Sequence, residues 1–291
     1  MRLFILACFL ALASTAAAQP PNEFPSVRLS GDQLRATWSK RKEPAFVLNA
    51  PKDGRPFVHP IRPWDGGGVF TEVSPGHHKH QTGLFIGFVK ANGRDYFHNR
   101  GKDHHRRDKD PLLDFGQSPF KAVHELLDGA GKALATQEQT WLLMEWPDGY
   151  IADLELSLEA KAALTLGKHD YGGLFLRMPW RPKTGGKAVN SEGDENAKAE
   201  GRKARWVDVG MPIEGRKDWG HIAILDHKDN PRHPPTWRVD GQLGVGPALT
   251  RAADLKIEAG KKLTLKYRLI VYTGDHNAKW VEATWKDFTR K

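Results

Sequence analysis

The chain has 291 residues and a single cysteine, Cys8. Cys8 lies inside an apolar N-terminal run, so the rest of the chain has no thiol. This absence excludes disulfide bridges, a cysteine nucleophile and thiolate metal ligands after residue 18. The stability of the protein must therefore come from its hydrophobic core, and the length suffices for one large domain or two small ones.

Long apolar runs are also scarce. The run at residues 3–13 is too short to span a bilayer. It follows Arg2 and precedes small residues that end at Ala18, which is the pattern of a secretory signal peptide; a buried N-terminal helix is the alternative. We expect residues 1–18 to be removed and residues 19–291 to be exported to the periplasm or the extracellular space, without stable membrane insertion.

Several functional motifs are missing. The sequence has no glycine-rich phosphate loop, no Gly-x-Ser-x-Gly elbow, no His-Glu-x-x-His pair and no dinucleotide fingerprint. Its formal net charge is +9, but the 44 lysines and arginines are interspersed with 35 acidic residues. A surface for polyanions is one interpretation. We favour an evenly solvated surface, with no nucleic-acid partner.

The sequence does contain abundant period-two alternation. Residues 154–158 and 263–271 alternate apolar and polar side chains, as strands with one buried face do. Shorter β-rich runs, separated by glycine, proline and Asn/Asp clusters, recur at residues 46–48, 69–73, 84–89, 141–145, 174–178, 205–209 and 221–225. Residues 277–290 instead repeat apolar side chains every four residues, which predicts one C-terminal helix.

These elements predict an all-β fold, a large two-sheet antiparallel β-sandwich with a C-terminal helix. The chain is too long for an immunoglobulin-type sandwich, and by analogy it suits the supersandwich of galactose-mutarotase-like domains. No boundary divides residues 19–291, so we expect one domain. Polar stretches at residues 99–110 and 182–203 interrupt the pattern. The second could be a flap over a site or a solvated insertion.

Residues 74–85 are the most informative segment. If they are extended, His78 and His80 project from the same face. Two neighbouring imidazoles suit a divalent metal ion, hydrogen bonds to hydroxyl groups, or general acid/base catalysis; a structural hydrogen-bonding role is the alternative. A metal ion would need further ligands, for which the candidates are His59, Asp95, His227 and His233.

A second polar segment, residues 226–237, follows an apolar strand. Its carboxylate, amide, imidazole and guanidinium groups belong to Asp226, His227, Asn230, Arg232 and His233. Loops at strand ends often bind ligands, and Trp237 offers a face on which a pyranose ring could stack. The alternative is a polar turn that satisfies its own backbone.

Three further positions enter the candidate site. His59 and Arg62 lie three residues apart on a proline-bounded, extended run and could line a groove. Glu192, in the long polar stretch, could supply a mobile acid or a late metal ligand. By contrast, we interpret the histidines of the charged stretch as surface residues; these are His98, His104 and His105.

In this order, several segments resemble a bacterial family often labelled methane oxygenase PmoA and otherwise of unknown function. The motifs are Arg-Pro-Phe-Val-His-Pro at 55–60, His-His-Lys-His-Gln-Thr-Gly-Leu-Phe at 77–85, Asn-Gly-Arg-Asp-Tyr-Phe at 92–97, Tyr-Gly-Gly-Leu at 171–174, Ser-Glu-Gly at 191–193, Leu-Asp-His at 225–227 and Asn-Pro-Arg-His-Pro at 230–234. The resemblance covers residues 50–275, and many relatives carry Asp where His77 stands. It implies a sugar-related role. The label fits poorly, because the membrane subunit of that name spans the bilayer many times, whereas this sequence has no apolar run long enough to span it.

We therefore expect an exported enzyme of the hydrolase, lyase or epimerase type that acts on a sugar or glycoside, metal-free or assisted by one divalent metal ion. His78 and His80 would be metal ligands or acid/base groups, and the other catalytic candidates are Glu192, Asp226, His227 and His233. Substrate-binding candidates, with the arginines as fixed cations, are His59, Arg62, Asp95, Arg177, Asn230, Arg232 and Trp237.

Two other functions remain open at this point. The first is a carbohydrate-binding module without catalysis, for which aromatic faces are available at Trp38, Trp64, Trp180, Trp206 and Trp237. The second is a metal-dependent oxidase, as the family label suggests. In each case the partner is a carbohydrate or another polar small molecule.

Overall fold

A computed structural model describes residues 23–98, 101–107, 109–114 and 117–290. The expected signal segment, residues 1–18, lies outside the described residues together with Cys8. Within the described ranges, no helix has the length and apolar character needed to cross a membrane.

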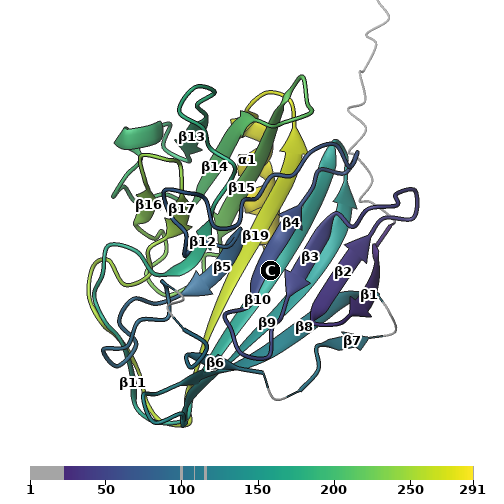
Figure 1. Cartoon of the computed structure of the whole chain (residues 1–291). Helices are drawn as coiled ribbons and strands as arrows, with labels where there is room; N and C mark the ends of the chain where they lie inside the picture. Colours follow the sequence, from purple (N-terminus) through teal and green to yellow (C-terminus); the bar gives the residue numbers. More distant parts are fainter. Residues whose placement is uncertain (1–22, 99–100, 108, 115–116, 291) are drawn as a thin grey trace, which may run out of the picture.

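Two antiparallel layers form the body of the protein (Figure 1). The first layer runs, in hydrogen-bonded order, through β8 (Gln117–Leu127), β9 (Ala133–Trp146), β10 (Gly149–Ala160), β19 (Lys262–Thr273), β15 (Trp219–Asp226), β14 (Trp206–Pro212) and β13 (Lys187–Asn190). The second runs through β1 (Ser26–Ser30), β2 (Gln33–Thr37), β3 (Phe46–Asn49), β4 (Phe57–Ile61), β5 (Leu84–Gly87), β12 (Gly173–Leu176), β17 (Val245–Pro247) and β16 (Trp237–Val239).

Short elements complete the fold. The strands β6 (His105–Arg106) and β7 (Leu112–Asp114) pair with β8, and a bridge from β1 to β8 joins the two layers. The strands β11 (Leu164–Leu166) and β18 (Leu255–Ile257) form a separate pair, and η1 (Asn196–Lys198) is a short 3-10 helix.

The main core lies between the two layers, and period-two alternation places it there. On β19, Leu265, Leu269 and Val271 point inward and are almost completely buried. They belong to one apolar cluster with Leu154 and Leu156 of the neighbouring strand β10. The two strands predicted from alternation are thus confirmed, and so is the two-sheet β-sandwich fold.

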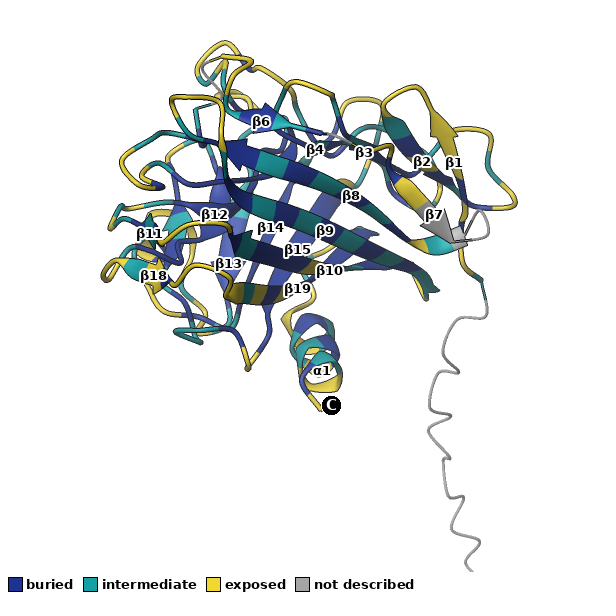
Figure 2. Ribbon diagram, turned by 90° about the horizontal axis from the view of Figure 1, so that it is seen from below, coloured by how far each residue is buried: buried dark blue, intermediate teal, exposed yellow. Residues whose placement is uncertain are grey.

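The C-terminal helix α1 (Ala278–Phe288) covers the outer face of the first layer (Figure 2). It begins at Asn277, whose side chain accepts a hydrogen bond from the backbone N–H of Trp280 at 3.0 Å. Val281 packs against Ile270 and Tyr272, which β19 directs away from the main core. The predicted C-terminal helix is therefore confirmed.

Two local features differ from the expectation. Residues 69–73 do not form a strand, and Val73 makes only an isolated bridge to Thr82. The stretch 182–203 contains regular structure that its composition did not predict, namely β13 and η1. The backbone of residues 187–190 forms a strand paired with β14 in spite of the polar composition of the surrounding stretch. Pairing with a neighbouring strand thus outweighs local composition here.

Candidate active site

A hollow with a volume of about 180 Å³ lies over the outer face of the second layer. We call it the histidine hollow, and its lining consists of His78, His80, Gln81, Phe97, His98, Tyr171, Phe175, Arg238 and Asp240. Its two predicted residues come from the turn between Val73 and Thr82, closed by a hydrogen bond from the backbone N–H of Ser74 to the carbonyl of Gln81 at 2.7 Å.

Three imidazole rings meet at this hollow. The rings of His78 and His80 have centroids 5.7 Å apart and are nearly perpendicular. The ring of His98 lies closer to His80, with centroids 4.6 Å apart. His98 was interpreted as a surface residue. That interpretation was wrong, because its side chain is only 18% exposed. His105 is also buried, so the same interpretation fails there.

Asp95 orients His98. Its Oδ2 lies 2.7 Å from Nδ1 of His98, and its Oδ1 accepts backbone hydrogen bonds from Phe97 and His98. Burial alone would raise the pKa of Asp95, but its hydrogen bonds with His98 lower that pKa below the ordinary value. With Nδ1 engaged by the carboxylate, Nε2 of His98 is directed to the hollow, 3.4 Å from the hydroxyl of Tyr171. An imidazole held in this way is a positioned acid or base.

Burial and neighbouring positive charges favour the neutral form of the other two imidazoles. Desolvation, aided by the neighbouring histidines and Arg55, lowers the pKa of His80 to about 4. Desolvation and the charge of Arg177 also lower the pKa of His78. Neutral imidazoles keep a lone pair available to accept a proton.

A buried arginine joins the two segments that carry the histidines. Arg55 donates to the carbonyl of His80 at 2.8 Å, to the hydroxyl of Thr82 at 3.0 Å, and to the carbonyl of Phe97. Its guanidinium carbon lies 3.6 Å from the ring centroid of Phe85. Burial lowers the pKa of Arg55 to about 9. Arg55 thus fixes His80 relative to the segment that ends at His98.

Arg177 forms part of the support behind the hollow. It is fully buried, donates to Oδ2 of Asp240 at 2.6 Å and to the carbonyl of Gln242 at 2.6 Å, and also donates to Gln81. Oδ1 of Asp240 accepts the backbone N–H groups of Gln242 and Gly244. Arg177 was expected to bind substrate. The structure instead shows it holding two lining residues, Gln81 and Asp240, in place.

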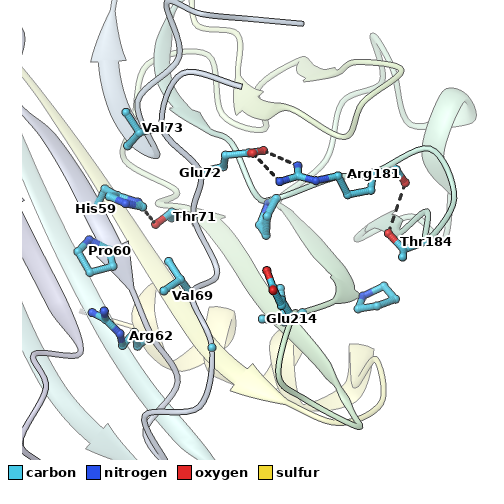
Figure 3. A pocket seen from close by; sticks show the side chains of 14 residues that line it. His59, Pro60, Arg62, Val69, Thr71, Glu72, Val73, Arg181, Thr184 and Glu214 are labelled. Atoms are coloured by element: carbon cyan, nitrogen blue, oxygen red, sulfur yellow. Dashed lines mark hydrogen bonds and ion pairs between the residues drawn. The ribbon is translucent and has the colours of Figure 1, made fainter. Parts of the chain in front are cut away.

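A larger groove, of about 840 Å³, contains the other two predicted residues of the N-terminal half. Figure 3 shows His59 and Arg62 on one side, facing Glu72 and Arg181 on the other. Nδ1 of His59 lies 2.9 Å from the hydroxyl of Thr71. Desolvation and the charge of Arg62 lower the pKa of His59. Residues 71–73 line the groove, whereas His78, His80 and Gln81 of the adjoining turn line the histidine hollow.

The segment at residues 226–233 lies elsewhere, against helix α1. Buried Asp226 accepts one hydrogen bond from Asn230 at 2.7 Å and pairs with Nδ1 of His233 at 2.6 Å. The ring of His233 stacks on Trp285, and the ring of His227 packs edge-on against Phe288. Burial raises the pKa of Asp226 in spite of these hydrogen bonds. None of these residues lines the histidine hollow or the groove, so the structure separates them from both of those parts of the predicted site.

Three other candidate residues make contacts away from the histidine hollow. Arg232 donates to the backbone carbonyls of Leu249, Ala253 and Asp254. Trp237 is fully buried and donates from Nε1 to the carbonyl of Ala204, which leaves no ring face for a sugar. Glu192 is exposed and pairs with Arg205 at 3.2 Å. Neither Glu192 nor Arg232 borders the histidine hollow.

The structure also places a possible metal ligand set where the sequence analysis did not look. Among the described residues, the ligand atoms of Asp208, His221 and His276 all lie within 4.8 Å of one another. His78 and His80, the predicted metal ligands, do not belong to such a group of three. The three positions are separated by 13 and 55 residues, so no local spacing signals the set. His98 and Tyr171 were missed at the hollow for the same reason.

Comparison with known proteins gives a family but no activity. No curated protein matches the chain. A solved structure of galactose 1-epimerase from Lactobacillus acidophilus NCFM is similar with a TM-score of 0.41 and 10% sequence identity, over 87% of this chain and 99% of that chain. The model of DUF6807, a family of unknown function, matches residues 28–286. The chain therefore belongs to the DUF6807 family.

Proposed function

We propose that this protein is an exported enzyme that acts on a sugar or glycoside by acid/base chemistry in the histidine hollow. The observation that carries the proposal is the pairing of two unlike imidazoles. His98 is hydrogen-bonded to a carboxylate, whereas His80 is desolvated and neutral, and their rings are 4.6 Å apart. Titratable neighbours in contrasting environments are the usual arrangement of an acid and its partner base.

The division of roles follows from these environments. Neutral His80 accepts a proton from a substrate hydroxyl or C–H group, and His98, supported by Asp95, donates one to the departing or ring oxygen. Arg238 borders the hollow with its guanidinium carbon 5.8 Å from the ring centroid of Tyr171. Its Nη1 pairs with Oε1 of Glu200 at 3.0 Å, and its remaining N–H groups are assigned to an oxyanion or a carboxylate of the substrate. This chemistry suits a hydrolase, lyase or epimerase and requires no redox step.

A panel of mono- and oligosaccharides tests the proposal. Polarimetry detects epimerisation, reducing-end release detects hydrolysis, and absorbance of an unsaturated product detects elimination. We expect His98→Ala and His80→Ala each to lower kcat by about 10²-fold or more. His227→Gln, which changes a histidine packed on Phe288, should leave kcat unchanged. Turnover that persists in a His80→Ala/His98→Ala double variant would refute the assignment.

A carbohydrate-binding module without catalysis is the second candidate, and the groove favours it. Its volume of about 840 Å³ is ample for several sugar units, and charged groups from Arg62, Glu72 and Arg181 line it. In this case glycan titration followed by calorimetry would show binding that survives the loss of His80 and His98 but weakens in Arg62→Ala. No turnover would occur on any glycan of the panel.

The export part of the proposal rests on residues 1–18, with their basic start, apolar run and small residues before Gln19. Mass spectrometry of the N-terminus, on protein isolated from the source cells, tests it. A chain that begins at Gln19 is the expected result. A chain that retains residues 1–18 in the cell interior would contradict export.

A further inference from the structure

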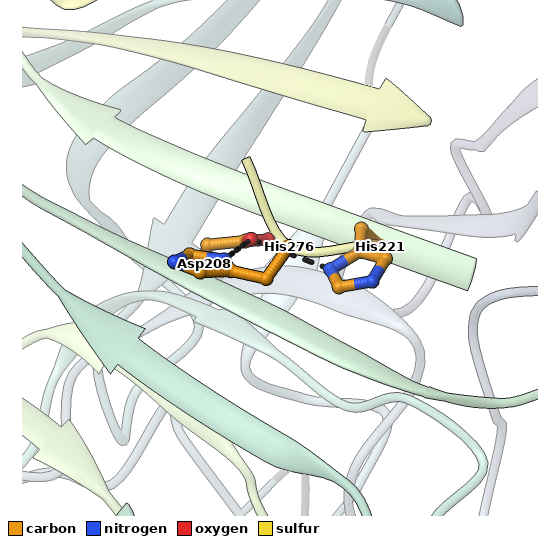
Figure 4. A group of neighbouring side chains, drawn as sticks. All are labelled: Asp208, His221 and His276. Atoms are coloured by element: carbon orange, nitrogen blue, oxygen red, sulfur yellow. Dashed lines mark hydrogen bonds and ion pairs between the residues drawn. The ribbon is translucent and has the colours of Figure 1, made fainter. Parts of the chain in front are cut away.

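A second polar cluster lies on the opposite side of the molecule from the histidine hollow. It consists of Asp208 on β14, His221 on the adjacent strand β15, and His276 between β19 and α1 (Figure 4). Asp208 and His221 point toward the face that α1 covers, as do their neighbours Trp206 and Ala223. We propose that this Asp208 cluster binds one divalent transition-metal ion of the zinc type.

The first argument is the hydrogen bond from His221 to a carbonyl. Nε2 of His221 lies 3.1 Å from the carbonyl oxygen of Gly274, which can only accept, so Nε2 carries a proton. In the neutral ring, Nδ1 then presents a lone pair, and it lies 3.3 Å from Oδ2 of Asp208. Two acceptors face each other at this distance. Either a second proton on the ring or a metal ion held between the Asp208 carboxylate and Nδ1 of His221 satisfies both groups, and titration with Co²⁺ distinguishes the two.

The second argument is the uneven use of the Asp208 carboxylate. Its Oδ2 is approached by the hydroxyl of Tyr272 at 2.5 Å and by Nδ1 of His276 at 2.5 Å, in addition to His221. Its Oδ1 is buried and has no hydrogen-bond partner among the described residues, and neither has Nε2 of His276. A fully buried carboxylate normally satisfies both oxygens. Coordination of a metal ion would use the unsatisfied acceptor capacity of these side chains.

The third argument is that the ligands are held rigidly. The ring of His221 stacks on Tyr272, with centroids 4.6 Å apart and planes at 20°. On its other side, a Cβ atom at Gly210 would lie 2.1 Å from Cε1 of His221, so only glycine leaves room for the ring. The carbonyl of Gly274 and the hydroxyl of Tyr272 orient a ligand each, as outer-shell partners of metal ligands do.

The donor set selects the metal. Two imidazole nitrogens and one carboxylate oxygen suit zinc and its first-row neighbours rather than calcium or magnesium, which prefer oxygen ligands. The cluster is accessible, because a hollow of about 200 Å³ is lined by His221 and His276 together with Lys187 and Trp219. Three protein ligands leave a fourth position for water.

The test uses the purified full chain, stripped with chelator and titrated with Co²⁺ and then Zn²⁺. We expect one equivalent of Co²⁺ to bind per chain with visible d–d absorption. This absorption should disappear when Zn²⁺ displaces Co²⁺, and Zn²⁺ should raise the Tm. His276→Gln should weaken binding by more than about 10-fold. Tyr272→Phe keeps all three ligands and should weaken binding less.

Two control variants locate the site. His233→Gln alters a histidine that also lies 2.6 Å from a buried carboxylate on the helix-covered side, and it should bind Co²⁺ as the wild type does. The His78→Ala/His80→Ala double variant should also retain the metal. Far-UV circular dichroism verifies the fold of each variant. Absence of stoichiometric binding in the wild type, or binding that the His276→Gln variant retains in full, would overturn the proposal. Loss in the double variant alone would do so as well, by moving the metal to the histidine hollow.

Discussion

Replacement of Asp240 by Asn should destabilise the protein strongly. Asp240 is the carboxylate partner of Arg177, and their side chains are 7% and 0% exposed. Breaking a buried ion pair by removing one partner costs about 3–5 kcal/mol, because the remaining charge stays buried. Gln81 and the carbonyl of Gln242 still accept from Arg177 in the variant. We therefore expect the lower end, a loss of about 3 kcal/mol in the free energy of unfolding.

The assay is urea unfolding followed by circular dichroism, with linear extrapolation to zero denaturant. Glu72→Gln is the matched control, because it breaks a similar pair with Arg181, whose side chain is 55% exposed. An exposed pair contributes at most about 1 kcal/mol. If Asp240→Asn lowers the free energy of unfolding no more than Glu72→Gln does, loss of Asp240 does not leave an uncompensated buried charge on Arg177. The role of this ion pair in supporting the hollow would then be wrong.

Three further predictions concern stability. Trp237→Ala should lower the free energy of unfolding by about 3–5 kcal/mol, measured in urea, because the ring is fully buried; normal stability with lost glycan binding would restore its stacking role. Gly210→Ala should cost about 1–3 kcal/mol in the same assay, because its Cβ would meet the ring of His221, and an unchanged midpoint would contradict that packing. Burial lowers the pKa of His124 from 6.5 to about 4. Between these values only the unfolded chain binds the proton, so stability falls with decreasing pH by about 3 kcal/mol, and titration of urea midpoints should show a smaller fall in His124→Gln.

The sequence was sufficient for the elements whose side chains follow a clear period. Residues 263–271 alternate regularly, and the structure places them in β19 with the predicted face inward. The four-residue spacing at residues 277–290 likewise predicts α1. The run at residues 69–73 was misleading, because an apolar composition alone does not supply a partner strand.

The candidate site was harder to predict, since it depends on long-range pairing. His78 and His80 were selected because they are two residues apart in the sequence. His98 lies beside them in the fold, where Arg55 joins the backbone of His80 to that of Phe97. The composition of residues 226–233 suggested a ligand, although helix α1 covers that segment and uses its polar groups for packing. Composition identifies reactive side chains; the sheet order decides which of them meet.

The position of β19 has a consequence for how the chain acquires its structure. This strand is the last in sequence order, yet it lies between β10 and β15 in the middle of the first layer. Until it is inserted, both neighbours present an open edge that can pair with other chains. Completion of the layer must therefore wait for residues near the C-terminus, and contacts of such long sequence separation form slowly.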